Sequence, residues 1–208
     1  MPLENWFAFV VASTILLMVP GPTILTVISY SIAHGERAKT PLVVAVVLGD
    51  STALLISLVG LGSILAASAF WFTVIKVVGG VYLLYLGMKL ILTRSPSAEI
   101  ETSTAADSRL KLFANTYLVT ALNPKGIVFF IAFLPQFVSL AFDLNHQLWV
   151  LAATFVFLAG LNAALYAIFA TSVRNLLSSD KAKRKFNILG GTLLSTAGVW
   201  SLLSKRPV

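Results

Sequence analysis

Apolar residues occur along this chain in long, nearly uninterrupted runs. A helix needs about 20 consecutive, mostly apolar residues to cross the hydrocarbon core of a bilayer. Six runs have about this length or more: Trp6–Ile32, Pro41–Ala66, Phe70–Leu92, Leu112–Leu140, Gln147–Ser172 and Phe186–Leu203. The pattern therefore predicts an all-α integral membrane protein with about six transmembrane helices.

The six runs and their connections use nearly all of the 208 residues. We therefore expect a single transmembrane domain, 1–208, with no separate soluble domain. Within it we expect three helices at 1–92, a cytoplasmic connector at 93–111 and three further helices at 112–208. The polar stretch Thr93–Ser108, rich in Ser, Thr, Ala and acidic residues, is typical of a flexible connector.

Two of the runs contain proline motifs that break a helix. Pro20-Gly21-Pro22 lies in the first run, and Asn123-Pro124-Lys125 lies in the fourth. A proline inside a helix removes one backbone hydrogen bond and blocks another, so it frees carbonyl groups that need partners in the protein or in cavity water. One such motif in each half of the chain indicates a transporter.

Weak internal similarity connects the two halves. Gly79-Gly80 with Gly87 in the third run matches Gly190-Gly191 with Gly198 in the sixth, and Gly49-Asp50 in the second run matches Gly160-Leu161-Asn162 in the fifth. Three helices per copy would make the copies enter the membrane from opposite sides, as in inverted-repeat transporters. The alternative is that these small residues only pack helices closely, within one chain or in a homo-oligomer.

Charge is scarce and unevenly placed. Charged residues make up 11% of the chain against 58% hydrophobic residues, whereas soluble domains carry roughly a quarter charged residues. Lys and Arg follow the first, third and fifth runs and are absent near Ala67–Ala69 and Ala141–His146, which places the basic connections in the cytoplasm and both termini outside. These basic residues are Arg37, Lys39, Lys89, Arg94, Arg109, Lys111, Arg174, Lys181, Lys183, Arg184 and Lys185.

Two alternatives bear on this assignment. If the first run fails to cross because of its prolines, five crossings remain and the N-terminus lies on the other side. A net charge of +7 would also fit a protein that binds nucleic acid. However, membrane orientation and anionic lipid headgroups account for basic residues in cytoplasmic loops, so we expect the lipid bilayer and no nucleic acid as a partner.

Polar residues deep in the runs are candidates for function, because an ionisable group near the bilayer centre costs about 2.5–3.5 kcal/mol on insertion scales. Asp50 lies about nine residues into the second run and Lys125 about thirteen into the fourth, which at about 1.5 Å per residue puts both in the middle third of the membrane. Pro20–Pro22 and Asn162 fall at a similar depth. We therefore expect these residues to line one central cavity.

The residue types in this set suit a zwitterion. The half-helix that begins at Pro22 presents free N–H groups and a positive dipole end to a carboxylate, and Lys125 adds a full positive charge. Asp50 suits an ammonium group or a proton, and Asn123 and Asn162 are available as hydrogen-bonding neighbours. The alternative is a purely structural ion pair between Asp50 and Lys125, with prolines that merely kink their helices.

At these motifs the chain resembles the LysE/RhtB family of amino-acid exporters. The resemblance rests on Pro20-Gly21-Pro22, His34-Gly35-Glu36-Arg37-Ala38, Gly49-Asp50, the segment Lys76–Gly87, Asn123-Pro124-Lys125 and Phe133–Phe137, in that order along nearly the whole chain. It implies a multi-pass protein of the bacterial inner membrane that exports amino acids or close derivatives, such as homoserine, threonine, leucine or lysine. It also implies proton antiport and an oligomer.

We assign roles to eight residues on this basis. Asp50 is the predicted proton-coupling carboxylate, so that proton and substrate compete for it. The predicted substrate-binding residues, which also shape the cradle and its hinges, are Pro20, Gly21, Pro22, Asn123, Pro124, Lys125 and Asn162. Because Asp50 is the one acidic residue of this set, we favour a substrate that is not strictly cationic.

Other function classes fit the sequence less well. No cluster of His, Cys, Asp and Glu has metal-ligand spacing, since cysteine is absent and His34 and His146 lie near the loops. No set of Ser, His and acidic residues converges for nucleophilic catalysis, so we expect no enzyme and no metal or other cofactor. A lipid flippase or scramblase, another small-solute or ion exporter, and a membrane subunit that transports nothing stay open as alternatives.

Overall fold

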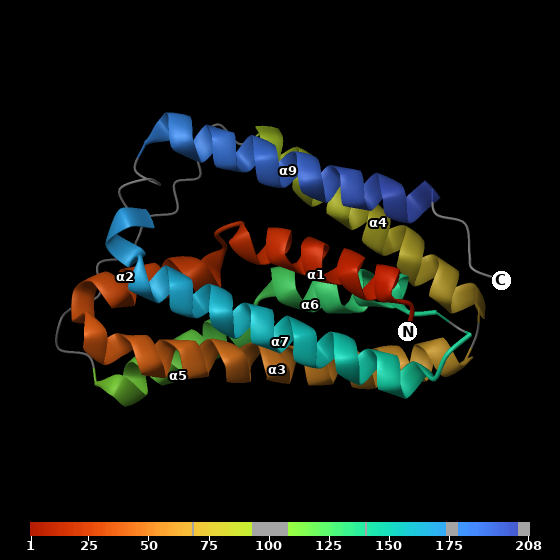
Figure 1. Cartoon of the computed structure of the whole chain (residues 1–208), viewed down its shortest axis with the longest axis horizontal. Coiled ribbons are helices and arrows are strands. Elements are labelled where there is room, and N and C mark those ends of the chain that lie inside the picture. The colour runs from red at the N-terminus through yellow and green to blue at the C-terminus, as the bar shows by residue number, and fades with distance from the viewer. Residues whose placement is uncertain (68, 93–107, 140, 174–178, 204–208) are drawn as a thin grey trace.

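The computed structural model describes residues 1–67, 69–92, 108–139, 141–173 and 179–203, and all of its regular elements there are helices (Figure 1). Of the predicted connector at 93–111, residues 93–107 lie outside the described part, and residues 109–111 belong to the first turn of a helix. In order, the elements are α1 (Leu3–Met18), α2 (Pro22–His34), α3 (Glu36–Ala67), α4 (Ala69–Leu92), α5 (Arg109–Ala121), α6 (Pro124–Ala132), a 3-10 helix (Leu134–Phe137), α7 (Leu144–Ile168) and α9 (Asp180–Leu203). The all-α prediction is confirmed.

Several helices are long and apolar enough to span a membrane. Among the described residues, α7 and the part of α3 at Glu36–Val59 meet this requirement on their own. Two bent pairs meet it together, namely α1 with α2, at an angle of 55°, and α5 with the segment Pro124–Phe137, at 42°. By length and composition the structure therefore offers two to four membrane spans, and six spans stay a prediction.

Both predicted helix breaks are present. The first run divides into α1 and α2 around Pro20-Gly21-Pro22, and the fourth divides into α5 and α6 around Asn123. Pro22 and Pro124 are each the first residue of the new helix, a position where the missing N–H costs no hydrogen bond and the fixed φ suits the helix. Pro22 and Pro124 therefore each start a helix.

Some helix ends differ from the ends of the apolar runs. α3 begins at Glu36 and includes Pro41, and α9 begins at Asp180, before the predicted Phe186. Apolar runs mark only what can sit in lipid, while helices continue into polar sequence. α6 gives way to the 3-10 helix before Pro135, because a proline disfavours helical geometry in the residue that precedes it.

Close helix packing depends on small residues. A Cβ atom built on Gly49 of α3 would lie 2.7 Å from the Thr120 side chain of α5, and one on Gly160 of α7 would lie 2.9 Å from Val47 of α3. Helix α4 packs along α9 (Figure 1), where a Cβ on Gly191 would lie 2.5 Å from the carbonyl oxygen of Gly87. Gly87 and Gly191 therefore pack helices within one chain.

The two larger of three apolar clusters fill the interior on either side of the helix breaks. The larger cluster combines α1, α3, α6, the 3-10 helix, α7 and one residue of α9, and includes Phe9, Phe130, Phe137 and Phe155. The second joins α2, the first half of α3, α5 and the end of α7, and includes Leu42 and Leu112. Many large apolar side chains are also exposed on the outside, as expected of a surface that faces lipid.

The helices run back and forth between two ends of the molecule (Figure 1). The start of α1, the end of α9 and the junction of α3 and α4 lie at one end. The junction of α2 and α3 and the starts of α5 and α9, with their basic residues, lie at the other.

Candidate functional site

A small polar cavity lies where the two helix breaks meet. Its volume is about 40 Å³. Five of the eight residues selected from the sequence line it, and they come from both breaks, from α3 and from α7: Gly21, Asp50, Asn123, Lys125 and Asn162. The structure thus brings the deep polar residues together, as their depth predicts, and the roles assigned to them stay predictions.

The three remaining predicted residues are the prolines. Pro22 and Pro124 begin α2 and α6 and fix the two breaks without lining the cavity. Pro20 lines a larger, neighbouring apolar pocket instead.

Lys125 caps the end of the broken helix α1. Its ammonium group donates hydrogen bonds to the carbonyl oxygens of Leu16 and Val19, both at 2.7 Å. The last turn of a helix leaves carbonyl groups without intrahelical partners and carries a partial negative charge, so a buried cation is favourable there. The sequence predicted the depth of Lys125 but not these backbone partners.

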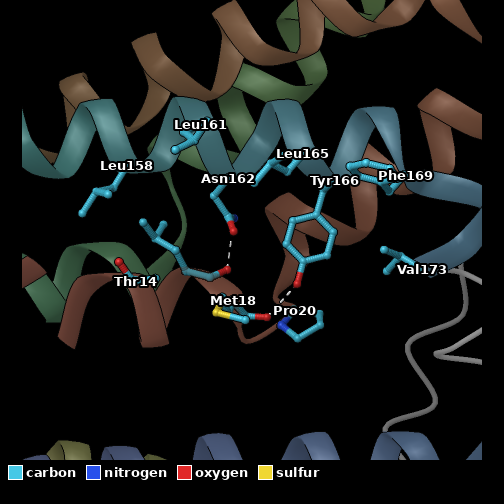
Figure 2. A pocket seen from close by; sticks show the side chains of 11 residues that line it. Thr14, Met18, Pro20, Leu158, Leu161, Asn162, Leu165, Tyr166, Phe169 and Val173 are labelled. Atoms are coloured by element: carbon cyan, nitrogen blue, oxygen red, sulfur yellow. Dashed lines mark hydrogen bonds between the residues drawn. The ribbon is translucent and has the colours of Figure 1, made fainter. Parts of the chain in front are cut away.

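Two side chains of α7 complete this cap. The Asn162 amide donates to the carbonyl oxygen of Leu17 at 3.1 Å, and the Tyr166 hydroxyl donates to that of Met18 at 2.7 Å (Figure 2). Four successive carbonyl groups at the end of α1, from Leu16 to Val19, therefore have side-chain donors from α6 and α7. Sequence reasoning missed Tyr166, although a tyrosine one helical turn after a deep asparagine was a usable signal.

Asn123 connects the two breaks. Its side-chain oxygen accepts a hydrogen bond from the backbone N–H of Lys125 at 3.1 Å and so caps the start of α6. Its amide donates to the hydroxyl of Thr23 in the first turn of α2, also at 3.1 Å. Thr23 is buried and lines the cavity, and nothing in the sequence distinguished it from other threonines in the runs.

The start of α2 is left without a side-chain cap. Gly21 precedes the helix and offers no capping side chain, and the first backbone hydrogen bond there runs from Leu25 to Gly21 at 3.0 Å. Among the described residues the N–H groups of Thr23 and Ile24 have no acceptor. With the positive end of the helix dipole, they form a site that suits a carboxylate.

Asp50 faces the same cavity from α3. It is 8% exposed, and its carboxylate makes no hydrogen bond or ion pair with any other described residue. Lys125 lies close enough to interact with it electrostatically, but the direct ion pair of the structural alternative is not formed. The Asp50 carboxylate is therefore available to a proton or an ammonium group.

Metal ligands do not gather in the described part of the chain. It contains no group of three or more His, Cys, Asp or Glu side chains that could hold a metal ion. The chemistry at the cavity is that of one carboxylate, one ammonium group, amide groups and helix ends.

Comparison with known proteins identifies the family. Residues 14–205 match the family model described as LysE type translocator. The chain belongs to the LysE family. A homoserine/homoserine lactone efflux protein of Salmonella typhi is 29% identical over 199 residues, which cover 95% of this chain and 96% of that protein. A leucine efflux protein of Klebsiella pneumoniae is 24% identical over 135 residues, or 65% of this chain and 64% of that protein.

A further relative is an uncharacterized membrane protein of Vibrio cholerae, which is 27% identical over 199 residues, or 96% of this chain and 97% of the relative. No solved structure matches the chain significantly. The LysE family match confirms the resemblance that the motifs carried. It makes the chain a membrane translocator whose relatives include proteins named for amino-acid efflux.

Proposed function

We propose that this LysE-family protein exports neutral amino acids, or close derivatives of them, across the bacterial inner membrane by proton antiport. The observation that carries the proposal is the polar cavity between the two breaks, which pairs one carboxylate and one ammonium group with two helix ends of opposite dipole sign. A zwitterion is complementary to such a site in both charge and hydrogen bonding.

The two ends of the substrate bind different helix ends. The substrate carboxylate binds the uncapped start of α2 and the Asn123 amide. The substrate ammonium group binds Asp50 and the carbonyl groups at the end of α1. In the described structure Lys125 occupies those carbonyl groups, so the substrate displaces its ammonium group, which moves to the substrate carboxylate.

The cavity volume supports a closed, substrate-free state. At about 40 Å³ the cavity is far below the roughly 300–1,000 Å³ of ordinary small-molecule sites. An amino acid therefore enters only when the surrounding elements move. Rocking of one three-helix half against the other, with hinges at Pro20 and Pro22, provides that movement.

Asp50 couples export to the proton gradient. Its carboxylate holds either a proton or the substrate ammonium group, because the described residues that line the cavity include no second acid to take the other. Protonated Asp50 leaves Lys125 on the α1 carbonyl groups and the cavity closed. Release of that proton on the cytoplasmic side lets substrate bind, so each export step is matched by proton entry.

The arrangement of helices supports six spans in two inverted repeats. The helices that the repeat treats as equivalent pack together, α3 with α7 and α4 with α9. The start of α1 and the end of α9 lie at the same end of the molecule, as an even number of crossings requires (Figure 1). The basic residues at the opposite end support a cytoplasmic position for that end.

Counterflow in proteoliposomes tests the proposal. Vesicles that contain the protein are loaded with one unlabelled amino acid at a time, and uptake of the labelled compound is measured for wild type, Asp50→Asn and Lys125→Met. We expect uptake of at least one neutral amino acid, lost in both variants. Matched controls are Asp143→Asn, at the start of α7, and Lys39→Met, in the exposed pair with Glu36; both retain uptake.

Failure has a clear form in this assay. If the folded wild type exchanges no amino acid, the proposal is wrong. If the vesicles instead redistribute labelled phospholipid between leaflets, the protein is a lipid translocase, which a polar cavity in the membrane would also serve.

A further inference from the structure

A second, larger cavity adjoins the polar one. It has a volume of about 310 Å³ and lies between the end of α1 and one face of α7 (Figure 2). Leu17 and Asn162 line both cavities. The hydrogen bond between the Asn162 amide and the Leu17 carbonyl oxygen, at 3.1 Å, therefore forms part of the boundary between them.

Among the residues that the structure describes, the lining of this pocket is apolar and carries no charge. The aliphatic and aromatic contacts come mostly from α7, through Leu158, Leu161 and Leu165, and from Phe169 directly after it, with Met18 from α1 opposite. Its polar side chains are already satisfied, because Thr14 donates to the Val10 carbonyl oxygen and Asn162 and Tyr166 donate to α1. An apolar ligand group needs no hydrogen-bond partner in this pocket, whereas a charged group would be left without a partner.

We propose that this pocket binds the side chain of the exported amino acid and selects uncharged, aliphatic side chains. The inference rests on the proposed function, since it requires the α-amino and α-carboxyl groups to occupy the polar cavity. From there a side chain reaches the apolar pocket past Leu17 and Asn162, because these residues border both spaces.

Size supports the same assignment. The apolar pocket has a volume of about 310 Å³, against about 40 Å³ for the closed polar cavity, and so lies within the usual range for a bound small molecule. Leucine and similar aliphatic side chains fill it better than alanine. Lysine and arginine side chains would place a cation where the described lining residues offer no acidic group.

Leu165 provides the sharpest test, because it lines the pocket and is 46% exposed, so its replacement disturbs little else. Leu165→Trp narrows the pocket and Leu165→Ala widens it. Ile168→Trp is the matched control, since Ile168 is 55% exposed on the same helix and does not line the pocket.

The measurement is competition in the counterflow assay, with uptake of labelled alanine challenged by unlabelled leucine, phenylalanine, alanine or lysine. In wild type we expect leucine to compete better than alanine and lysine to compete poorly. In Leu165→Trp the leucine concentration for half-inhibition rises at least about tenfold, as for a lost fit of a few methylene groups, while that for alanine changes less than about threefold. In Leu165→Ala the phenylalanine concentration for half-inhibition falls. Ile168→Trp gives the same values as wild type.

Three outcomes would overturn the inference while leaving the proposed function intact. In the first, wild type exchanges amino acids but leucine competes no better than alanine. In the second, Leu165→Trp shifts leucine and alanine equally, as expected if the pocket holds a lipid acyl chain. In the third, Ile168→Trp reproduces the effect of Leu165→Trp. By contrast, a folded wild type that exchanges no amino acid contradicts the proposed function itself.

Discussion

The two helix breaks look equivalent in the sequence but are held in different ways. At the second break the chain provides its own caps: the Leu122 N–H donates to the Leu118 carbonyl oxygen at 3.0 Å, and the Asn123 side chain caps α6. At the first break the end of α1 is capped by Lys125, Asn162 and Tyr166, all more than 100 positions away in the chain.

This difference assigns the breaks different tasks. Local caps keep the second break in one geometry, so it acts as a fixed platform that carries Lys125 and Asn123. The first break is held only by side chains of other helices, and its α2 start has no cap at all. A ligand can therefore replace its partners without unfolding either helix, which is why we assign substrate binding to the first break.

The largest effect is expected from Lys125→Met, which removes the donor shared by Leu16 and Val19. Uncapped, buried carbonyl groups cost about 1–3 kcal/mol of unfolding free energy, and transport is lost. Thermal unfolding in detergent measures the first effect and counterflow the second. An equally stable, fully active variant would show that the first break does not depend on this cap. Lys39→Met serves as the control, because exposed ion pairs contribute at most about 1 kcal/mol.

Asp50→Asn is expected to abolish proton-driven exchange with little loss of stability, because the Asp50 carboxylate makes no hydrogen bond that the amide would break. An imposed pH gradient across proteoliposomes drives amino-acid accumulation in wild type and not in the variant. If the variant accumulates substrate with the pH dependence of wild type, Asp50 does not couple transport to protons.

Asn123→Ala tests whether Asn123 contributes to substrate binding or only caps α6. The loss of an N-cap costs about 0.5–2 kcal/mol, and this variant also loses the bond to Thr23, so we expect a clear rise in the substrate KM. Ser108→Ala removes the corresponding cap of α5, where Ser108 accepts from Lys111 at 3.3 Å. Equal KM values in the two variants would show that Asn123 is only a structural cap.

The smallest effect is expected from Tyr166→Phe, which deletes one hydrogen bond to the Met18 carbonyl oxygen. Its contribution is about 0.5–1.5 kcal/mol, so transport falls a few-fold and the variant folds normally. Tyr30→Phe is the control, because the Tyr30 hydroxyl accepts from Asn115 away from the cavity. If Tyr166→Phe matches Tyr30→Phe in every assay, Tyr166 does not contribute to the cap of α1.

Much of the cavity was predictable from the sequence, because depth follows from counting residues along a helix of known rise. That arithmetic brought Asp50, Lys125 and Asn162 to one level, and proline chemistry located the starts of α2 and α6. The partners of these residues were not predictable. Lys125 binds backbone carbonyl groups, which every residue has, and the contacts of Thr23 and Tyr166 depend on how the helices pack.

The most direct test of substrate binding at the first break uses the absence of cysteine from the chain. Gly21→Cys places a thiol at the cavity, where its Cβ would lie at an ordinary 3.6 Å from the Lys125 side chain. The backbone φ of −122° suits any residue. Ser179→Cys, in an exposed bend before α9, is the control. Reaction with a membrane-permeant maleimide is followed with and without the transported amino acid. The account predicts that the amino acid slows labelling at position 21 and not at 179; unchanged labelling at 21 in an active variant would contradict it.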